Sequence, residues 1–343
     1  MIYRNIEIWG ADTLKEIKGG VCPQKVPDEV CDKLSSWAPA HARRNIGMEI
    51  RFVPAEEAEI KLTLSTKLEG ETNTLILYHG AMQSGSVYLI TNEPKTITVK
   101  LPEKLQALER IRNENGLAFS PKVVRFIMGL SPVIIHSVEG DCRVPEKDEV
   151  PELNGIFYGS SITQGSNGII PNLLWNRRTA DKLGVDCRNF GFAGCCLVEK
   201  AMADYFAALD DWDFMVLELG INLVGKIELD EFRERVRYTL NTIHNSHPDK
   251  YMFCIDIFHY GSDNGSYYTK VDAFRQVVIE EAAKIASPYI KIFGGETILT
   301  SDLGLSSDMV HPGVEGVIEM ADNLSRLMRP YISKYKRIIK QAD

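Results

Sequence analysis

The chain lacks the features that mark membrane-spanning, secreted and nucleic-acid-binding proteins. No run of about 18 apolar residues occurs in its 343 positions, so no segment is predicted to cross a bilayer. Its 39 Lys and Arg are outnumbered by 47 Asp and Glu, and the net charge of −8 argues against a nucleic-acid or anionic-membrane partner. The first residues, MIYRNIEIWG, carry charge and no apolar core, so no secretory signal is predicted and a cytoplasmic location is expected.

Cysteine is sparse and has no regular spacing. The seven cysteines are odd in number and scattered, with no paired CxxC motifs, so neither a disulfide framework nor a structural zinc site is expected. No motif for an organic cofactor is found, and neither a metal nor a cofactor is predicted. The apolar fraction of 44% and charged fraction of 25% are those of an ordinary globular protein.

The first part of the chain has the pattern of short β-strands. Seven segments rich in β-branched and aromatic residues predict an antiparallel β-sandwich, with a short helix between strands over 101–116. Residues 1–46 are interpreted as an irregular lead-in with one short helix near Asp28–Ser35. The seven segments are 47–53, 58–65, 73–80, 85–92, 95–101, 122–128 and 132–138.

The second part has a different pattern, and we place the boundary between residues 1–148 and 149–343. Compact apolar segments alternate with helical patterns here, which predicts a doubly wound parallel sheet with helices on both faces. The predicted strands are 153–158, 185–190, 213–219, 251–257 and 289–293. The predicted helices are 171–183, 198–209, 229–246, 268–286 and 314–335.

Polar residues follow the predicted strands of this second part. Open α/β sheets collect functional groups at the carboxyl ends of their strands. Ser161 follows the first strand, Gly194 the second and Asn222 the third, while Asp308 and His311 precede the last helix. Each alone is ordinary for a turn, a loop or a helix start, but their joint placement in this order is hard to produce by chance.

These residue types suit nucleophilic catalysis. A serine hydroxyl needs an adjacent base, and His311 is the only histidine with an aspartate at such short spacing before a helix. Pro312 keeps His311 out of helical geometry, so His311 is expected to lie just before the first turn of the last helix. Asp308 can fold back to bond Nδ1 of His311 and aim Nε2 at Ser161.

Other residues are expected around this site. The backbone N–H groups of Ser161 and Gly194 and the side-chain amide of Asn222 can converge on a developing oxyanion. Because a doubly wound sheet leaves its site open at the strand ends, the first domain, or residues 1–46, is expected to form one wall of the cleft.

Three further residues are candidates for the lining of the substrate pocket. His259 and Tyr260 lie at the exit of the fourth strand, where pocket residues are found in such sheets. Trp175 follows the serine segment, although at helical spacing a tryptophan is more often part of the core.

The order of the motifs resembles that of the SGNH (GDSL-like) hydrolase superfamily, and the resemblance covers about residues 152–335. It implies a flavodoxin-like, doubly wound hydrolase domain with Ser161 as the nucleophile. Ser160 and Leu223 depart from the family pattern, since each replaces a usual aspartate. The matching blocks are Gly159-Ser160-Ser161, Gly194, Gly220-Ile221-Asn222-Leu223, and Asp308 with His311.

With a β-sandwich in front, the chain looks like a bacterial esterase subgroup. Its closest analogies there are carbohydrate deacetylases with a jelly-roll-like first domain. The resemblance implies a serine esterase for short-chain, most plausibly acetyl, esters of a small molecule or oligosaccharide. Two alternatives stay open, an acyltransferase that uses the same serine and a carbohydrate-binding protein with a decayed hydrolase domain. A homo-oligomer also stays open.

Overall fold

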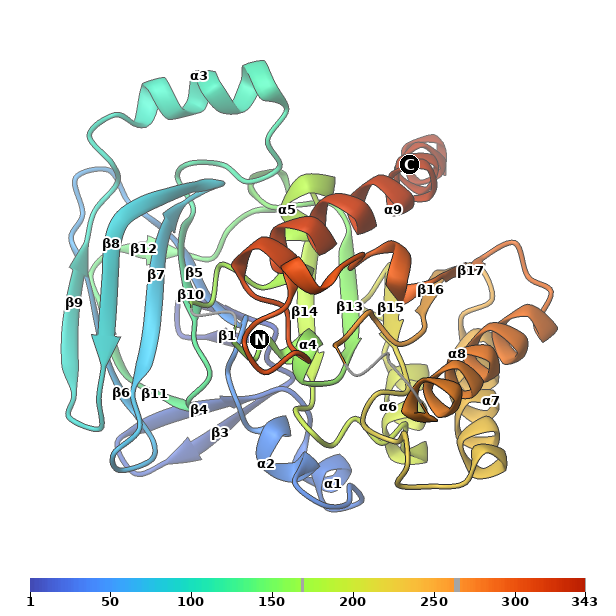
Figure 1. The fold of residues 1–343 in the computed structure, drawn as a ribbon. Helices are drawn as coiled ribbons and strands as arrows, with labels where there is room; N and C mark the ends of the chain where they lie inside the picture. The colour runs from blue at the N-terminus through green and yellow to red at the C-terminus, as the bar shows by residue number, and fades with distance from the viewer. Residues whose placement is uncertain (168–169, 262–265, 343) are drawn as a thin grey trace.

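Three β-sheets organise the protein, whose computed structural model describes residues 1–167, 170–261 and 266–342 (Figure 1). A seven-stranded antiparallel sheet has the order β1-β2-β5-β10-β7-β8, with β12 paired to β5. Its strands are β1 (Ile2–Tyr3), β2 (Ile6–Trp9), β5 (Glu49–Pro54), β7 (Asn73–His79), β8 (Met82–Ile90), β10 (Val124–Met128) and β12 (Cys142–Arg143). A five-stranded antiparallel sheet has the order β3-β4-β11-β6-β9. Its strands are β3 (Thr13–Ile17), β4 (Gly20–Gln24), β6 (Ile60–Thr66), β9 (Lys95–Val99) and β11 (Val133–Glu139).

The two antiparallel sheets pack face to face around one hydrophobic core. Phe52 and Phe126 of the first sheet share a buried cluster with Leu64 and Ile135 of the second. Each of the seven segments predicted between residues 47 and 138 overlaps one of these strands. The antiparallel sandwich is therefore confirmed. The helix α3 (Leu105–Asn115) also lies where it was predicted, and Gly116 ends it in the left-handed conformation with φ of 61°.

The prediction of an irregular lead-in over residues 1–46 is wrong, except for the short helix predicted near Asp28–Ser35, where α1 (Asp28–Cys31) lies. Residues 1–46 form strands β1 to β4 and two short helices, α1 and α2 (Ala38–Ala42). Strands of two to five residues are too short to show an alternating pattern. β4 is also buried at four of its five positions, because it pairs with β3 on one side and β11 on the other.

The second part contains a five-stranded parallel sheet of order β14-β13-β15-β16-β17. Numbered along the chain this order is 2-1-3-4-5, the flavodoxin-like arrangement. The strands are β13 (Asn154–Gly159), β14 (Asp186–Gly191), β15 (Phe214–Glu218), β16 (Tyr251–Ile255) and β17 (Ile290–Phe293). The long helices are α5 (Trp175–Leu183), α6 (Lys200–Ala208), α7 (Leu229–Ser246), α8 (Ser266–Lys284) and α9 (Val314–Ala342).

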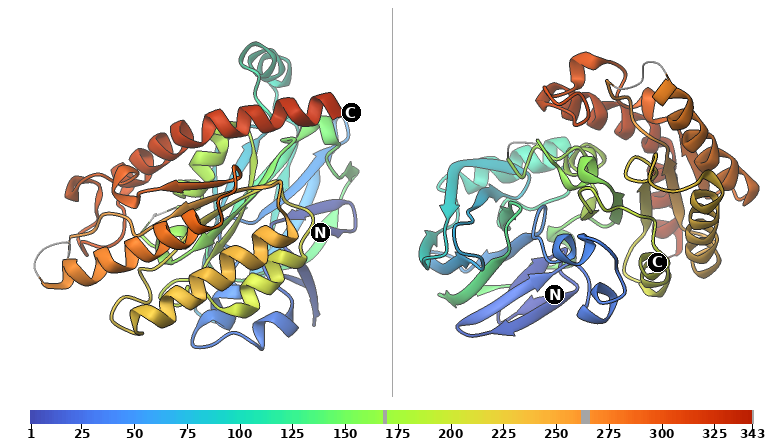
Figure 2. Two further views of the ribbon diagram at one scale, coloured as in Figure 1. Left: turned by 90° about the vertical axis from the view of Figure 1, so that its right-hand side faces the viewer. Right: turned by 60° about the horizontal axis from the view of Figure 1, so that its bottom comes forward.

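Helices cover both faces of the parallel sheet (Figure 2). Side chains of β15 alternate between two buried clusters, as the two-residue repeat of a strand requires. Met215 and Leu217 belong to the cluster that contains residues of α6, α7 and α8. Phe214 and Val216 belong to the cluster that contains residues of α5 and α9. The doubly wound arrangement predicted for this part is therefore confirmed.

A buried network of ion pairs joins the sandwich to the parallel sheet. Arg51 of β5 donates to both carboxylate oxygens of Asp186 on β14, at 2.6 and 2.7 Å. Glu49 accepts hydrogen bonds from Arg51 at 2.9 Å, from Arg125 of β10 at 2.7 and 2.9 Å, and from Arg177 of α5. None of these five side chains is more than 4% exposed.

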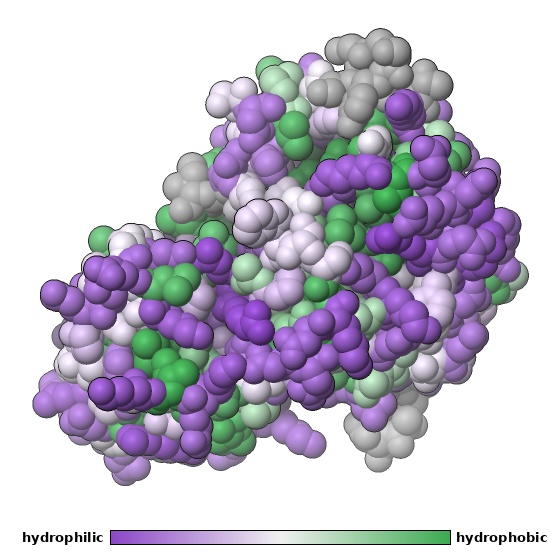
Figure 3. All heavy atoms as spheres, turned by 90° about the horizontal axis from the view of Figure 1, so that it is seen from below, coloured by the Kyte–Doolittle hydropathy of each residue, from purple (hydrophilic) through white to green (hydrophobic). Residues whose placement is uncertain are grey.

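The molecular surface is mainly polar in the view from below, with small hydrophobic areas between hydrophilic side chains (Figure 3). Trp37 and Leu303 are two strongly exposed large apolar residues, at 73% and 91%. None of the helices in the described part of the chain combines the length and hydropathy of a bilayer-spanning segment.

The ion-pair network predicts a large loss of stability when one partner is removed. We expect Asp186→Ala to lower the free energy of unfolding by about 3–5 kcal/mol, because the Arg51 guanidinium stays buried without its bidentate partner. Urea unfolding measures the change. Lys15→Ala is the control, because its ion pair with Asp28 is exposed and is expected to contribute less than about 1 kcal/mol. Equal effects of the two substitutions would contradict the prediction.

Candidate active site

Ser161 lies in a tight turn at the carboxyl end of β13, which we call the serine turn (Gly159–Gln164). It is the first residue of the short helix α4 (Ser161–Gln164). The side chain of Ser160 caps this helix by accepting the backbone N–H of Ile162 at 3.1 Å. Gly165 ends the helix in the left-handed region with φ of 101°. The turn therefore presents Ser161 at the edge of the sheet where functional groups were expected.

A buried glutamate supports the serine turn from the neighbouring strand. Glu218, the last residue of β15, accepts hydrogen bonds from the backbone N–H and hydroxyl of Ser160 at 2.7 and 3.0 Å. It also accepts a bond from the Thr163 hydroxyl at 2.8 Å. Burial raises the pKa of Glu218 to about 7, although these hydrogen bonds act in the opposite direction. Sequence reasoning assigned no role to Glu218, and the available signal was a carboxylate inside the apolar segment 214–219, FMVLEL.

Two glycines allow this close packing. A β-carbon on Gly159 would collide with the side chains of Glu218 and Thr163. A β-carbon on Gly191, at the end of β14, would collide with the backbone of Gln164. The serine turn therefore lies directly against the ends of both neighbouring strands.

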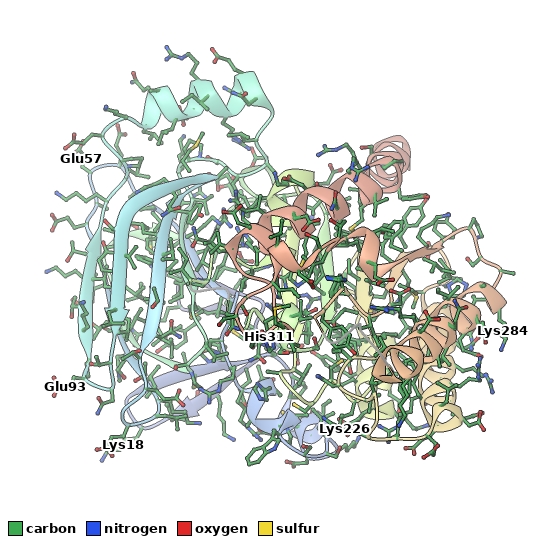
Figure 4. All side chains as sticks on the ribbon, viewed as in Figure 1. Lys18, Glu57, Glu93, Lys226, Lys284 and His311 are labelled. Atoms are coloured by element: carbon green, nitrogen blue, oxygen red, sulfur yellow. The ribbon has the colours of Figure 1, made fainter. Side chains whose placement is uncertain are left out.

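His311 and Asp308 approach Ser161 from the loop before α9. Nε2 of His311 lies 2.7 Å from Oγ of Ser161, and Nδ1 lies 2.7 Å from Oδ2 of Asp308. His311 precedes the first residue of α9, Val314, as the adjacent proline led us to expect. Figure 4 shows His311 near the middle of the molecule. The structure thus joins Ser161 to His311, 150 positions later in the sequence, and to Asp308 in one hydrogen-bonded series.

The Asp308 carboxylate is held by more than the histidine. Oδ1 accepts the backbone N–H groups of Val310 and His311 and the hydroxyl of Ser306, each at 2.9 Å. Asn167 donates to Oδ2 at 2.8 Å. Partial burial alone would raise the pKa of Asp308, but hydrogen bonds from His311, Val310 and Ser306 lower it well below its ordinary value. Asp308 is therefore an ionised acceptor, and sequence reasoning missed Asn167 and Ser306 as its supports.

A cleft of about 810 Å³ opens beside Ser161. Gly194, Asn222 and Tyr260 all line it, in agreement with where their strand exits were predicted. Oδ1 of Asn222 accepts the backbone N–H of Cys196 at 3.0 Å, so the amide NH2 group is the part of this side chain that can serve the cleft. The lining residues are Ser161, Ile162, Ser166, Ala193, Gly194, Ile221, Asn222, Tyr260, Val310 and His311.

Two of the predicted lining residues lie elsewhere. Trp175 is 1% exposed, and its indole N–H donates to the carbonyl of Ile162 at 3.0 Å, so it supports the serine turn from the core. Its interpretation as a substrate-lining residue is wrong, because it faces the sheet on the first turn of α5. His259 is not among the lining residues of the cleft, and its Nε2 bonds to Asp302 at 2.8 Å.

No residue of the sandwich or of positions 1–46 is among those that line the cleft. In the described part of the chain the lining residues all fall between 161 and 311.

The departure from the family pattern at position 223 has a structural explanation. Leu223 is 1% exposed, belongs to the core that packs α6 to α8, and donates its backbone N–H to Gly220 at 2.8 Å. An apolar residue thus fills a site in the core where the family usually has aspartate.

Sequence comparison assigns the family. Residues 154–329 match the profile of the GDSL-like Lipase/Acylhydrolase family, which is more than half of the chain. The chain belongs to this family. It is a serine esterase of the SGNH type. No curated protein sequence matches it.

Solved structures share the fold over nearly the whole chain. A salicylyl-acyltransferase from a tetracycline biosynthetic pathway, SsfX3, has a TM-score of 0.73 and 15% identity, with 95% of each chain covered. A family two carbohydrate esterase from Clostridium thermocellum, in complex with cellohexaose, has a TM-score of 0.62 and 13% identity, with 95% of this chain and 99% of that chain covered. The acetyl xylan esterase Est2A from the rumen bacterium Butyrivibrio proteoclasticus has a TM-score of 0.59 and 12% identity, with 97% of each chain covered. At these identities the likeness shows the fold.

The buried Glu218 predicts a pH dependence of stability. Its pKa is about 7 in the folded protein and 4.5 as the ordinary value, so the folded chain keeps a proton that the unfolded chain releases between these pH values. The free energy of unfolding should therefore fall by about 3 kcal/mol from this group as pH rises from 4.5 to 7. Glu218→Gln should lack this component. The free energy of unfolding of both proteins is measured in urea at several pH values in this range. An equal change with pH in the two proteins would contradict the prediction.

Proposed function

We propose that the protein hydrolyses short-chain esters, above all acetyl esters of carbohydrates, through an acyl intermediate on Ser161. The observation that carries this proposal is the hydrogen-bonded series from Ser161 Oγ through His311 to Asp308, with 2.7 Å at both contacts. This geometry is that of a nucleophile, its general base and the group that orients the base. It also favours an active enzyme over the decayed, carbohydrate-binding alternative.

The first half of the reaction acylates the serine. His311 Nε2 accepts the hydroxyl proton as Ser161 Oγ bonds to the ester carbonyl carbon, whose oxygen becomes an oxyanion. The N–H groups of Ser161 and Gly194 and the amide of Asn222 donate to that oxyanion. The tetrahedral intermediate then collapses, the bond to the alkoxy oxygen breaks, and His311 returns the proton to the departing alcohol.

The second half regenerates the enzyme. A water molecule gives a proton to His311 and its oxygen bonds to the acyl carbon, forming a second oxyanion in the same position. Collapse breaks the bond to Ser161 Oγ, which recovers the proton from His311, and the carboxylic acid leaves. Asp308 stays ionised throughout, because its surrounding hydrogen-bond donors favour the carboxylate. Its role is to keep Nδ1 of His311 protonated and to stabilise the imidazolium.

The choice of substrate is supported by the cleft and by the structural neighbours. Ile162, Ile221 and Val310 give the cleft apolar surface near Ser161, which suits a short acyl chain. A volume of about 810 Å³ leaves room for one or more sugar rings beyond it. Two of the solved structures with the same fold are a carbohydrate esterase in complex with cellohexaose and an acetyl xylan esterase. Release of acetate from a panel of acetylated mono- and oligosaccharides tests this proposal.

Acyl transfer to an alcohol is the second candidate, because the salicylyl-acyltransferase shares the fold across 95% of the chain. The same acyl-serine intermediate can react with an alcohol in place of water. Hydrolysis of 4-nitrophenyl acetate with and without an added sugar separates the two reactions. Formation of an acetylated sugar at the expense of acetate would favour the transferase.

The triad should respond to substitution as a unit. Ser161→Ala and His311→Ala are each expected to remove nearly all turnover, up to about a million-fold in kcat, and the double variant should be little worse than either. Asp308→Asn should cost less, since Asp308 forms no bond to substrate. Kinetics with 4-nitrophenyl acetate on variants with unchanged Tm provide the measurement. A folded Ser161→Ala protein with wild-type activity would refute the mechanism.

Asn222 should contribute mainly to the transition state. Asn222→Ala is expected to lower kcat by about 100- to 1000-fold with little change in KM, because its amide bonds chiefly to the oxyanion. Tyr260→Phe is a comparison at the same cleft, and should change kcat far less. A rise in KM at unchanged kcat for Asn222→Ala would assign Asn222 to substrate binding instead.

A further inference from the structure

Lys25 is a buried lysine that the proposed mechanism does not use. It directly follows β4 in the N-terminal part and is 1% exposed. Its Nζ donates to the carbonyl oxygen of Gly191 at 3.5 Å, a residue of the hydrolase part. Its backbone is held in place, because its N–H donates to Ala42 at 3.1 Å and its carbonyl accepts the Tyr205 hydroxyl at 3.3 Å.

A series of hydrogen bonds connects Lys25 to Glu218 through two peptide groups. The peptide group Gly191–Phe192 accepts from Lys25 and donates its N–H to the carbonyl of the peptide group Gly159–Ser160 at 2.8 Å. The second peptide group then donates its N–H to Glu218 at 2.7 Å. Every hydrogen bond in the series is donated in the same direction, from Lys25 towards Glu218. Hydrogen bonds arranged in this way polarise one another where water is excluded.

The two peptide groups belong to the segments that must be aligned for catalysis. One lies at the start of the serine turn, next to Ser161. The other begins the segment Gly191–Gly194, whose last residue lines the cleft. Burial lowers the pKa of Lys25 to about 7 and raises that of Glu218 to about 7, so neither charge is easily supported alone in its surroundings.

We propose that Lys25 and Glu218 act together as positioning residues that lock the segment Gly191–Gly194 to the serine turn. The lock fixes the Gly194 donor relative to Ser161 Oγ, although neither Lys25 nor Glu218 lines the cleft. This inference rests on the proposed function of Ser161 and Gly194. It also gives the N-terminal part a role in catalysis, as a support behind the oxyanion donors and not as a wall of the cleft.

Three variants test the lock: Lys25→Met, Glu218→Gln and the double variant. Each single substitution is expected to lower kcat/KM for 4-nitrophenyl acetate by about 10- to 100-fold through kcat, since a displacement of about 1 Å has costs of this size. The double variant should be no worse than the more damaged single variant, because both break the same series. The Ki of an alkylboronic acid, which forms a tetrahedral adduct on serine, should rise by the factor by which kcat/KM falls.

Tyr205→Phe is the matched control, since Tyr205 contacts the backbone of Lys25 and lies outside the series. Its kcat should stay within about twofold of wild type at comparable Tm. A folded Lys25→Met protein with wild-type kcat, or a double variant whose loss is the product of the single losses, would overturn the inference. If Lys25→Met does not fold, Glu218→Gln tests the inference instead. The expected fall in its kcat and rise in its boronic acid Ki would support the lock, and wild-type values of both would overturn it.

The proposed function is checked separately in the wild-type protein. A fluorophosphonate should label Ser161 stoichiometrically and abolish activity. Failure to label Ser161 would refute the proposed function, and with it the basis of the lock. Labelling of Ser161 combined with full activity in Lys25→Met would refute the lock alone.

Discussion

The architecture depends on a carboxylate that is fully removed from water. Glu49 is 0% exposed and accepts hydrogen bonds from three guanidinium groups, two in the sandwich and one in the hydrolase part. A buried carboxylate of this kind is tolerable only when its charge is matched and its lone pairs are occupied. Arg51 and Arg125 of the sandwich and Arg177 of the hydrolase part meet this requirement together. The two parts are therefore fixed relative to one another by directional bonds as well as by apolar contact.

The strongly periodic elements could be predicted from the sequence, and the short N-terminal ones could not. The helix α7 was predicted over the residues at which it occurs, because an amphipathic pattern over 18 residues leaves little ambiguity. β4 gave no such signal, since pairing on both edges and burial on both faces removes the alternation that marks a strand. What makes residues 1–46 regular is their partner strands, which are distant in sequence.

The candidate site shows the same division. Residues with an expected chemical role, Ser161 and His311 among them, follow strand ends or precede a helix, so local sequence places them near one edge of the sheet. Glu218 supports the serine turn and Asn167 supports Asp308 through contacts between residues distant in sequence. No spacing pattern in the sequence predicts these contacts. The prediction for Trp175 was wrong because its place in the sequence does not determine which way its side chain points. A position just after the serine segment is compatible with cleft and core alike, and only the direction of the first turn of α5 decides between them.

The ion-pair network between the sandwich and the parallel-sheet part affects whether the parallel-sheet part could be combined with a different domain. Cutting the chain between residues 148 and 149 would separate Arg177 and Asp186 from Glu49 and Arg51, and would expose paired charges that the intact protein keeps dry. The same cut would take Lys25 away from Gly191. Grafting this hydrolase sheet onto another accessory domain would therefore require the new neighbour to supply arginine, carboxylate and lysine groups in the same places. Recombination of this part with other domains is therefore constrained by the charged groups at this interface.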